Sequence, residues 1–152
     1  MISVEPYTGT PKLMPLAFGL GAVGLVLTAV GAFTGDARAT AHSYLIAFTY
    51  WVGISVSALL MVAIFHTAKA KWMTVLRRAM EAMANAIPIL FVLGLGLIPL
   101  LKHLYPWVPG SELASHLSEL EREHLGHKQH GYLNLPFFGA RYLIYFGLWW
   151  FV

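Results

Sequence analysis

Cysteine is absent from this 152-residue chain, and charged side chains make up only 11% of it. The absence of cysteine excludes, within this chain, a disulfide framework, thiolate ligation of zinc or iron–sulfur clusters, and covalent attachment of c-type haem. The chain is 58% hydrophobic, with a mean hydropathy of +0.66, whereas about a quarter of the residues in a soluble domain are charged. The composition therefore predicts a membrane protein. The net charge of +3 does not indicate a nucleic-acid partner, because the ten Lys and Arg are scattered among apolar runs.

Four apolar stretches are each long enough to cross a bilayer, which takes about 20 residues. They predict an all-α fold, a polytopic bundle of four transmembrane helices in a single membrane domain over 1–152, with spans at about 13–33, 44–65, 82–101 and 134–152. The third contains Asn85, Pro88 and Pro99, which lipid tolerates only when neighbouring helices satisfy the freed backbone groups, so we expect it to be packed. The fourth continues apolar to Val152, from which we expect a longer parent chain.

The distribution of basic residues predicts the orientation of the bundle. Lys69, Lys71, Arg77 and Arg78 follow the second stretch, against the single acid Glu81, so this segment and the amino terminus are predicted to be cytoplasmic. The loop over 102–133 is predicted to be external.

The external loop is predicted to contain a short amphipathic helix over 112–125. Ser111 is a candidate N-cap, and Gly126 a candidate terminator. Four of the histidines in this loop lie within or just after the predicted helix, but glycines interrupt their spacing, which favours surface positions facing a partner over a metal site. These are His116, His124, His127 and His130.

Gly19, Gly21 and Gly24 form a G-x-G-x-x-G pattern within the first stretch. The dinucleotide-binding version of this pattern requires a preceding strand and a soluble βαβ unit. Inside an apolar span, the glycines instead favour close helix packing.

Arg77, Arg78, Glu81 and His66 are the proton-path candidates. Arg77 and Arg78 lie four and three residues before Glu81, so the acid can reach either guanidinium on one helix face. The cluster either conducts protons or holds a charged head group, or it only anchors the third span. His66 is an interfacial anchor, a proton-entry group or, less favoured, a haem ligand.

Arg141 lies seven positions after Asn134, about 10 Å into the fourth helix. An intramembrane cation is costly unless it snorkels or pairs, so it is a site candidate by default. Its partner is expected to be a backbone carbonyl, Tyr142 or Tyr145, a ligand, or another chain.

Several runs of the sequence resemble one known family. They are His103–Trp107, Lys128, Tyr132–Phe138, Arg141 and Tyr145, preceded by Tyr50–Gly53, Trp72, the Arg77, Arg78, Glu81 cluster and Pro88. This pattern is similar to quinone-binding subunit 2, a membrane subunit of alternative complex III, and covers most of the chain.

The resemblance implies a multi-pass subunit in the bacterial cytoplasmic membrane, of which this sequence is the first part. It implies a respiratory or photosynthetic quinol:cytochrome c or other electron-acceptor oxidoreductase. Its partner subunits would be an iron–sulfur, molybdopterin-like protein, a multihaem cytochrome and a related polytopic protein, which carry the haem and the iron–sulfur clusters. This chain would be non-catalytic alone, with no covalent cofactor and no metal, and would contact lipids and quinol.

In this reading Arg141, Asn134 and Tyr132 are the quinone or polar-site candidates, and the aromatic side chains near them line a lipid- or quinone-facing surface. Those side chains are Tyr105, Trp107, Tyr132, Phe137 and Phe138. Two alternatives stay open. The chain is a purely structural membrane scaffold, or it is a transporter or channel fragment whose helix, broken around Pro88 and Pro99, lines a pathway.

Overall fold

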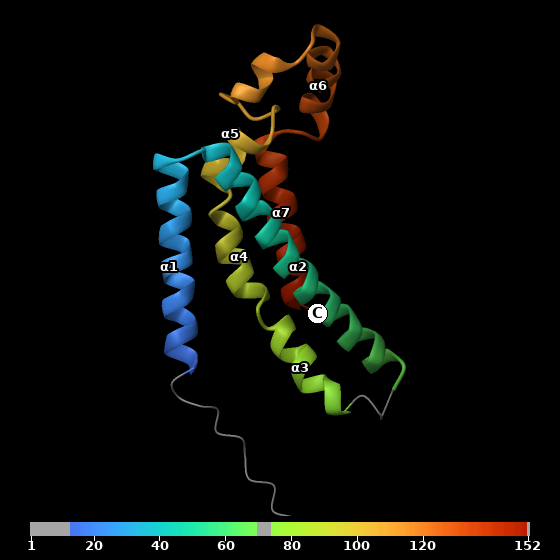
Figure 1. Cartoon of the computed structure of the whole chain (residues 1–152). Coiled ribbons are helices and arrows are strands. Elements are labelled where there is room, and N and C mark those ends of the chain that lie inside the picture. The colour runs from blue at the N-terminus through green and yellow to red at the C-terminus, as the bar shows by residue number, and fades with distance from the viewer. Residues whose placement is uncertain (1–12, 70–73, 152) are drawn as a thin grey trace, which may run out of the picture.

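The computed structural model describes residues 13–69 and 74–151, and within these ranges the chain is helical with no strand (Figure 1). The elements are α1 (Leu13–Thr34), α2 (Ala37–Thr67), α3 (Thr74–Ala84), α4 (Ile87–Leu95), the 3₁₀ helix η2 (Ile98–Leu100), α5 (Leu101–Leu104), the 3₁₀ helix η3 (Glu112–His116), α6 (Glu119–Gly131) and α7 (Leu135–Phe151).

Three helical stretches of the described chain are long and apolar enough to cross a membrane. They are Leu13–Thr34, Ala37–Thr67 and Leu76–Leu95, and they are compatible with a multi-pass membrane protein. Helix α7 is equally apolar in character but has 17 residues, about 25 Å at 1.5 Å per residue, against a hydrocarbon core of about 30 Å. The structure thus gives three candidate spans where the sequence predicted four. Val152, the last residue of the predicted fourth span, lies outside the described residues.

Helix α2 begins earlier than its apolar stretch. The Asp36 carboxylate accepts hydrogen bonds from the backbone N–H groups of Arg38 (2.9 Å) and Ala39 (3.2 Å). This N-cap starts the helix at Ala37 instead of the predicted 44, because a cap satisfies the free N–H groups of the first turn whether or not that turn is apolar.

The predicted third span, 82–101, is not one continuous helix. The chain turns at Asn85–Ala86 between α3 and α4, and again at Gly96–Leu97 before η2. Pro88 lies in the first turn of α4 and Pro99 in η2. Since proline has no N–H to donate to the residue four positions earlier, each proline sits where a helix begins and not in its interior.

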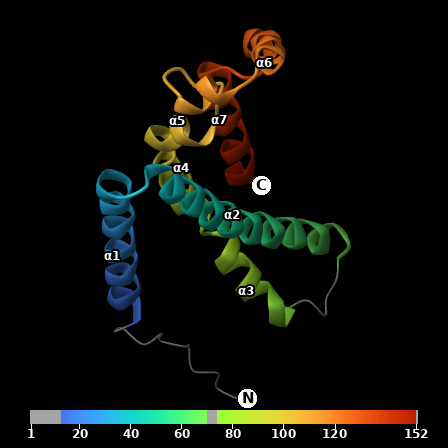
Figure 2. The same cartoon turned by 45° about the horizontal axis from the view of Figure 1, so that its top comes forward.

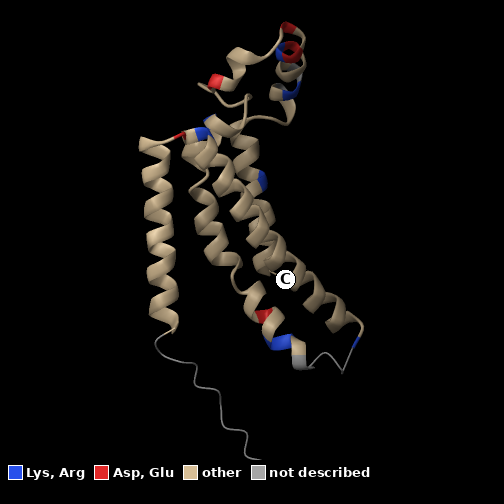
Figure 3. Cartoon of the chain, in the orientation of Figure 1, with Lys and Arg blue, Asp and Glu red and all other residues tan. Residues whose placement is uncertain are grey.

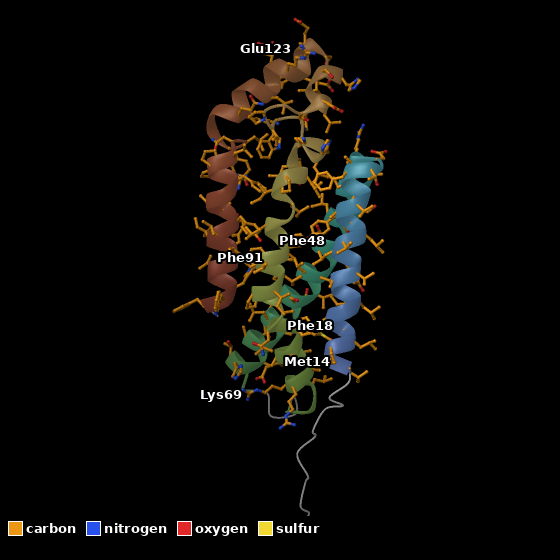
Figure 4. All side chains as sticks on the ribbon, turned by 90° about the vertical axis from the view of Figure 1, so that its left-hand side faces the viewer. Met14, Phe18, Phe48, Lys69, Phe91 and Glu123 are labelled. Atoms are coloured by element: carbon orange, nitrogen blue, oxygen red, sulfur yellow. The ribbon has the colours of Figure 1, made fainter. Side chains whose placement is uncertain are left out.

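Helix α4 packs inside the bundle, as the prolines of the predicted third span indicated. Ile87 and Leu90 form a buried cluster with Phe146 of α7, and Phe48 of α2 packs against it. Figure 4 shows α4 between α7 and α1, with α2 crossing behind. The rings of Phe91 and Phe146 lie 5.6 Å apart.

Helix α1 contrasts with α4, since none of its residues is buried. It approaches α2 near the turn that joins them, where Gly31 lies against Thr40, and it stands apart from α3 at its other end (Figures 1 and 2).

The region over 105–133 folds differently from the single helix predicted over 112–125. A 3₁₀ helix occupies Glu112–His116, and α6 then runs from Glu119 through Gly126 to Gly131. Ser118, and not Ser111, provides the side-chain cap, because Glu121 lies three residues after it and completes a capping box. One glycine inside a helix costs only about 1 kcal/mol, which does not end α6 at Gly126.

Candidate functional site

Charged side chains concentrate at the two ends of the molecule (Figure 3). We name the end with Lys69, Arg77 and Arg78 the basic end, and the end with η3 and α6 the glutamate-rich end. Lys69 and Glu123 lie at these opposite ends in Figure 4. Lys71 and the first twelve residues, which entered the orientation prediction, lie outside the described residues.

At the basic end, Arg77 and Glu81 form an ion pair on α3. The Arg77 Nε donates to Glu81 Oε1 over 2.6 Å, in the i,i+4 arrangement predicted from the spacing. Both side chains are about half exposed, at 55% and 41%, so the pair contributes at most about 1 kcal/mol to stability. Pairing with Arg77 still fixes where the carboxylate lies.

A cleft of about 350 Å³ opens beside the break between α3 and α4, and we name it the break cleft. Glu81 and Asn85 provide its polar wall, and Trp149 and Trp150 of α7 lie across from them. Its remaining lining is mostly apolar and comes from Leu59, Val62, Ala84, Ile87 and Pro88. An acid at the edge of an apolar cleft, with an amide beside it, is suited to taking up and releasing a proton.

His66 and Arg78 share the basic end but not the ion pair. The Nδ1 of His66 lies 3.1 Å from the carbonyl oxygen of Val62, one turn earlier in α2. Arg78 is exposed on α3. Within the described part of the chain, no hydrogen bond or ion pair joins either residue to Glu81, so the structure brings together only Arg77 and Glu81 of the four candidates.

Near the glutamate-rich end, Arg141 lies against the start of its own helix. Its Cζ is 3.7 Å from the centroid of the Tyr132 ring and 4.8 Å from that of Phe137. Its Nη1 donates to the Tyr132 carbonyl oxygen over 3.1 Å. A backbone carbonyl was one of the expected partners, whereas Tyr142 and Tyr145 are not the partners found. Because side chains point toward the N-terminus of a helix, the guanidinium reaches back toward the polar end, as in snorkelling.

Asn134 caps α7. Its Oδ1 accepts from the Phe137 N–H over 2.8 Å, and its Nδ2 lies 3.5 Å from the Gln129 carbonyl oxygen. The Asn134 side chain and one N–H group of Arg141 thus have partners within the chain. Tyr132 is engaged through its ring and its carbonyl oxygen. The structure therefore brings Arg141 and Tyr132 into direct contact, with Asn134 in the turn that leads into α7.

The aromatic residues at this end divide into a packed and an exposed group. Trp107 is only 9% exposed, with the ring of Tyr105 at 5.6 Å and that of Phe138 at 5.9 Å between centroids. Tyr132 and Phe137 are 57% and 42% exposed. The expectation that all five line a lipid- or quinone-facing surface is therefore wrong for Trp107, which joins the buried cluster of Leu101 and Val108.

Sequence reasoning missed the tyrosines that hold the broken helix. The Tyr142 hydroxyl donates to the Phe91 carbonyl oxygen, and the Tyr44 hydroxyl donates to that of Leu93 over 2.7 Å. Both carbonyls lie in the last turn of α4, just before the turn at Gly96. A tyrosine hydroxyl within an apolar helix was the available signal, because a buried hydroxyl is expected to find a partner.

Of the four loop histidines, the structure describes the side chains of His116 and His124, and both are exposed. No group of three or more metal-binding side chains occurs among the described residues. The side chains of His127 and His130 lie outside what is described.

No protein-family model matches the chain, and no curated protein matches it.

Proposed function

We propose that this chain is a membrane subunit of a quinol-oxidising electron-transfer complex of the alternative complex III type. In this proposal it supports assembly of the complex, borders the route of quinol from the lipid, and contributes a proton path. It lies in the bacterial cytoplasmic membrane, with the basic end cytoplasmic and the glutamate-rich end external.

The observation that carries the proposal is the convergence of the residues on which the family resemblance rests. Tyr105 and Trp107 precede Phe138 by about thirty positions, yet their rings pack together. Arg141 lies over Tyr132 in the same region. Motif residues that contact one another in one folded unit support a family relationship better than the same residue types on unrelated surfaces.

The proposed proton path begins at Glu81. The Glu81 side chain is 41% exposed at the basic end, where it pairs with Arg77. It also lines the break cleft, whose lining includes Trp149. A group that touches water on one side and an apolar cleft on the other is placed to pass a proton inward.

The electron carriers belong to partner subunits in this proposal, since the chain offers no cysteine for attaching c-type haem or an iron–sulfur cluster. No reaction step is assigned to Asn134 or Arg141. Their proposed role is to shape the polar edge of an aromatic surface along which quinol passes.

The test begins with affinity isolation of the full-length protein from its native membranes. Co-isolation of haem and iron–sulfur proteins, together with quinol-dependent reduction of an electron acceptor, is the expected result. Isolation of the chain as a lone oligomer that catalyses solute uptake would instead support the transporter alternative.

Two variants then separate a functional subunit from a scaffold. Glu81→Gln is expected to leave the complex assembled but to slow quinol oxidation by about 100-fold, the scale of a lost proton-transfer group. Arg141→Leu removes the contact with Tyr132 and is expected to reduce both assembly and turnover. Glu123→Gln, on the exposed face of α6, is the matched control. Unchanged assembly and turnover in both test variants would leave only the scaffold alternative.

A further inference from the structure

A second cleft, of about 380 Å³, lies near the glutamate-rich end between α1 and the segment from Gly96 to His103. We name it the outer cleft. Leu25, Ala29 and Ala32 of α1 form one side, and Pro99 and Leu100 form the other. It shares no lining residue with the break cleft.

The rim of the outer cleft carries two side chains that can hold an anion. Lys102 and His103 occupy the last turn of α5 and both line the cleft. Among the described residues, no carboxylate pairs with either of them. Asp36, which precedes α2, is engaged in capping that helix. No acidic residue lines the cleft itself.

The outer cleft is therefore apolar along its walls and polar where Lys102 and His103 line it. The apolar walls extend along α1 from Phe33 to Leu25, whereas Lys102 and His103 lie in α5. Such an arrangement matches an amphiphile with a negative head group, because the Lys102 ammonium and the His103 imidazole meet the head group at the interface and the tail stays among apolar side chains.

The size of the cleft argues against a helix as its occupant. A helix about 10 Å in diameter and 5.4 Å in pitch fills roughly 400 Å³ with a single turn. The outer cleft therefore admits about one turn of helix, far less than a transmembrane segment. A flexible hydrocarbon chain fits a narrow volume of this kind, which also falls within the range of about 300–1,000 Å³ of small-molecule sites.

We propose that the outer cleft binds one anionic phospholipid, with its phosphate between Lys102 and His103 and an acyl chain between α1 and Pro99–Leu100. The lipid fills the space that α1 leaves beside the bundle, and so attaches a helix that has no buried residue of its own. The proposal depends only on a membrane location, and not on the electron-transfer function proposed above.

The test uses the full-length protein reconstituted into nanodiscs of equimolar phosphatidylglycerol and phosphatidylcholine. Native mass spectrometry after release into detergent identifies the retained lipid. The expected result is one phosphatidylglycerol per chain, retained in preference to phosphatidylcholine. Each cation near a head group contributes about five-fold to binding, so the double substitution K102Q/H103Q should reduce the preference by at least five-fold. Lys128→Gln, an exposed cation on α6, is the matched control and should retain it.

A second pair of variants tests the apolar part of the cleft. Ala29→Phe fills the space beside α1 and should remove the lipid whatever its charge, whereas Val30→Phe, at an exposed position outside the lining of the outer cleft, should retain it. Equal retention of the two lipids by the unmodified protein, or an unchanged preference in K102Q/H103Q, would overturn the proposal. So would a photo-cross-linker at position 29 that captures a polypeptide instead of a lipid. None of these readouts depends on quinol oxidation, so failure here is distinguishable from failure of the proposed function.

Discussion

The guanidinium of Arg141 lies over the Tyr132 ring although its Cα belongs to the second turn of α7. A long side chain that points toward the helix N-terminus can carry its charge back to the polar end, and there it gains a ring face and a carbonyl oxygen. The sequence predicted that a charged side chain at this depth costs free energy unless it finds a partner. Which partner it finds depends on the turn at Tyr132–Asn134, which brings the Tyr132 ring and carbonyl oxygen within reach.

Gly94 illustrates a different constraint, that of close approach. A Cβ at this position would collide with the Tyr142 hydroxyl and would lie 2.8 Å from Cζ of Phe48. Both neighbours are the ends of rigid rings packed against the core, so they cannot turn away without losing their contacts.

We therefore expect Gly94→Ala to lower the free energy of unfolding by about 1–3 kcal/mol, the usual cost of overpacking. The measurement is thermal or denaturant unfolding of the solubilised chain. Gly19→Ala is the control, because no atom lies within 4 Å of its added Cβ, and it should not destabilise the protein. A Gly94→Ala variant as stable as that control would show that the rings adjust freely.

At the scale of elements, the broken third span depends on its neighbours. Tyr44 from α2 and Tyr142 from α7 donate to two different carbonyls in the last turn of α4. Pro99 lacks the N–H that a continued helix would supply to Leu95, and the turn at Gly96–Leu97 replaces regular helical bonds with shorter-range ones.

Tyr44→Phe and Tyr142→Phe are each expected to destabilise the bundle by about 0.5–1.5 kcal/mol, the net contribution of one hydrogen bond. The effects should be close to additive in the double variant, since the two hydroxyls serve separate carbonyls. Tyr50→Phe, on the exposed face of α2, provides the matched control. Denaturant titrations of the parent protein and these four variants measure the differences. If the double variant were no less stable than either single variant, the two hydroxyls would contribute to one shared interaction.

The capping box of α6 makes a prediction about pH. The Ser118 backbone N–H, and then its hydroxyl, donate to the Glu121 carboxylate and lower the pKa of Glu121. A lowered pKa in the folded state means that the ionised cap stabilises α6 fully above the ordinary glutamate pKa, and that this contribution disappears as the pH falls through the lowered value.

NMR titration of the Glu121 carboxyl carbon should therefore give a pKa below that of an ordinary glutamate. Ser118→Ala should raise it part of the way back, because the hydroxyl bond is lost while the backbone N–H remains. Ser115→Ala, whose hydroxyl donates to the Glu112 carbonyl oxygen, should leave it unchanged. An unshifted Glu121 in the parent protein would contradict the capping geometry.

At the scale of the whole molecule, the two ends differ in charge, and this difference underlies the proposed orientation. Arg77 and Arg78 lie at one end, and the acids of α6 lie at the other (Figure 3). Short loops rich in Lys and Arg are retained in the cytoplasm during insertion.

The absence of cysteine makes this orientation directly measurable, because any introduced thiol is unique in the chain. Glu123→Cys should react with a membrane-impermeant maleimide added to intact cells, after removal of any outer barrier. Arg78→Cys should react only once the cytoplasmic membrane is opened. Both positions are exposed in the structure, so differential labelling reports the side of the membrane and not burial. The reverse pattern would place the basic end outside.

The sequence by itself determined the helical class, three of the four predicted spans as stretches long and apolar enough to cross a membrane, and the Arg77–Glu81 pair. These follow from hydropathy and from residue spacing along one helix, which are local properties. It also predicted that the proline-containing span would be packed, because lipid cannot satisfy a broken backbone.

Only the tertiary structure decided how that packing is achieved. The bonds from Tyr44 and Tyr142 join residues about fifty positions apart, the burial of Trp107 depends on Phe138 from a different helix, and the outer cleft exists because α1 diverges from its neighbours. No local pattern specifies which hydroxyl reaches which carbonyl, since each contact depends on how separate helices are placed beside one another.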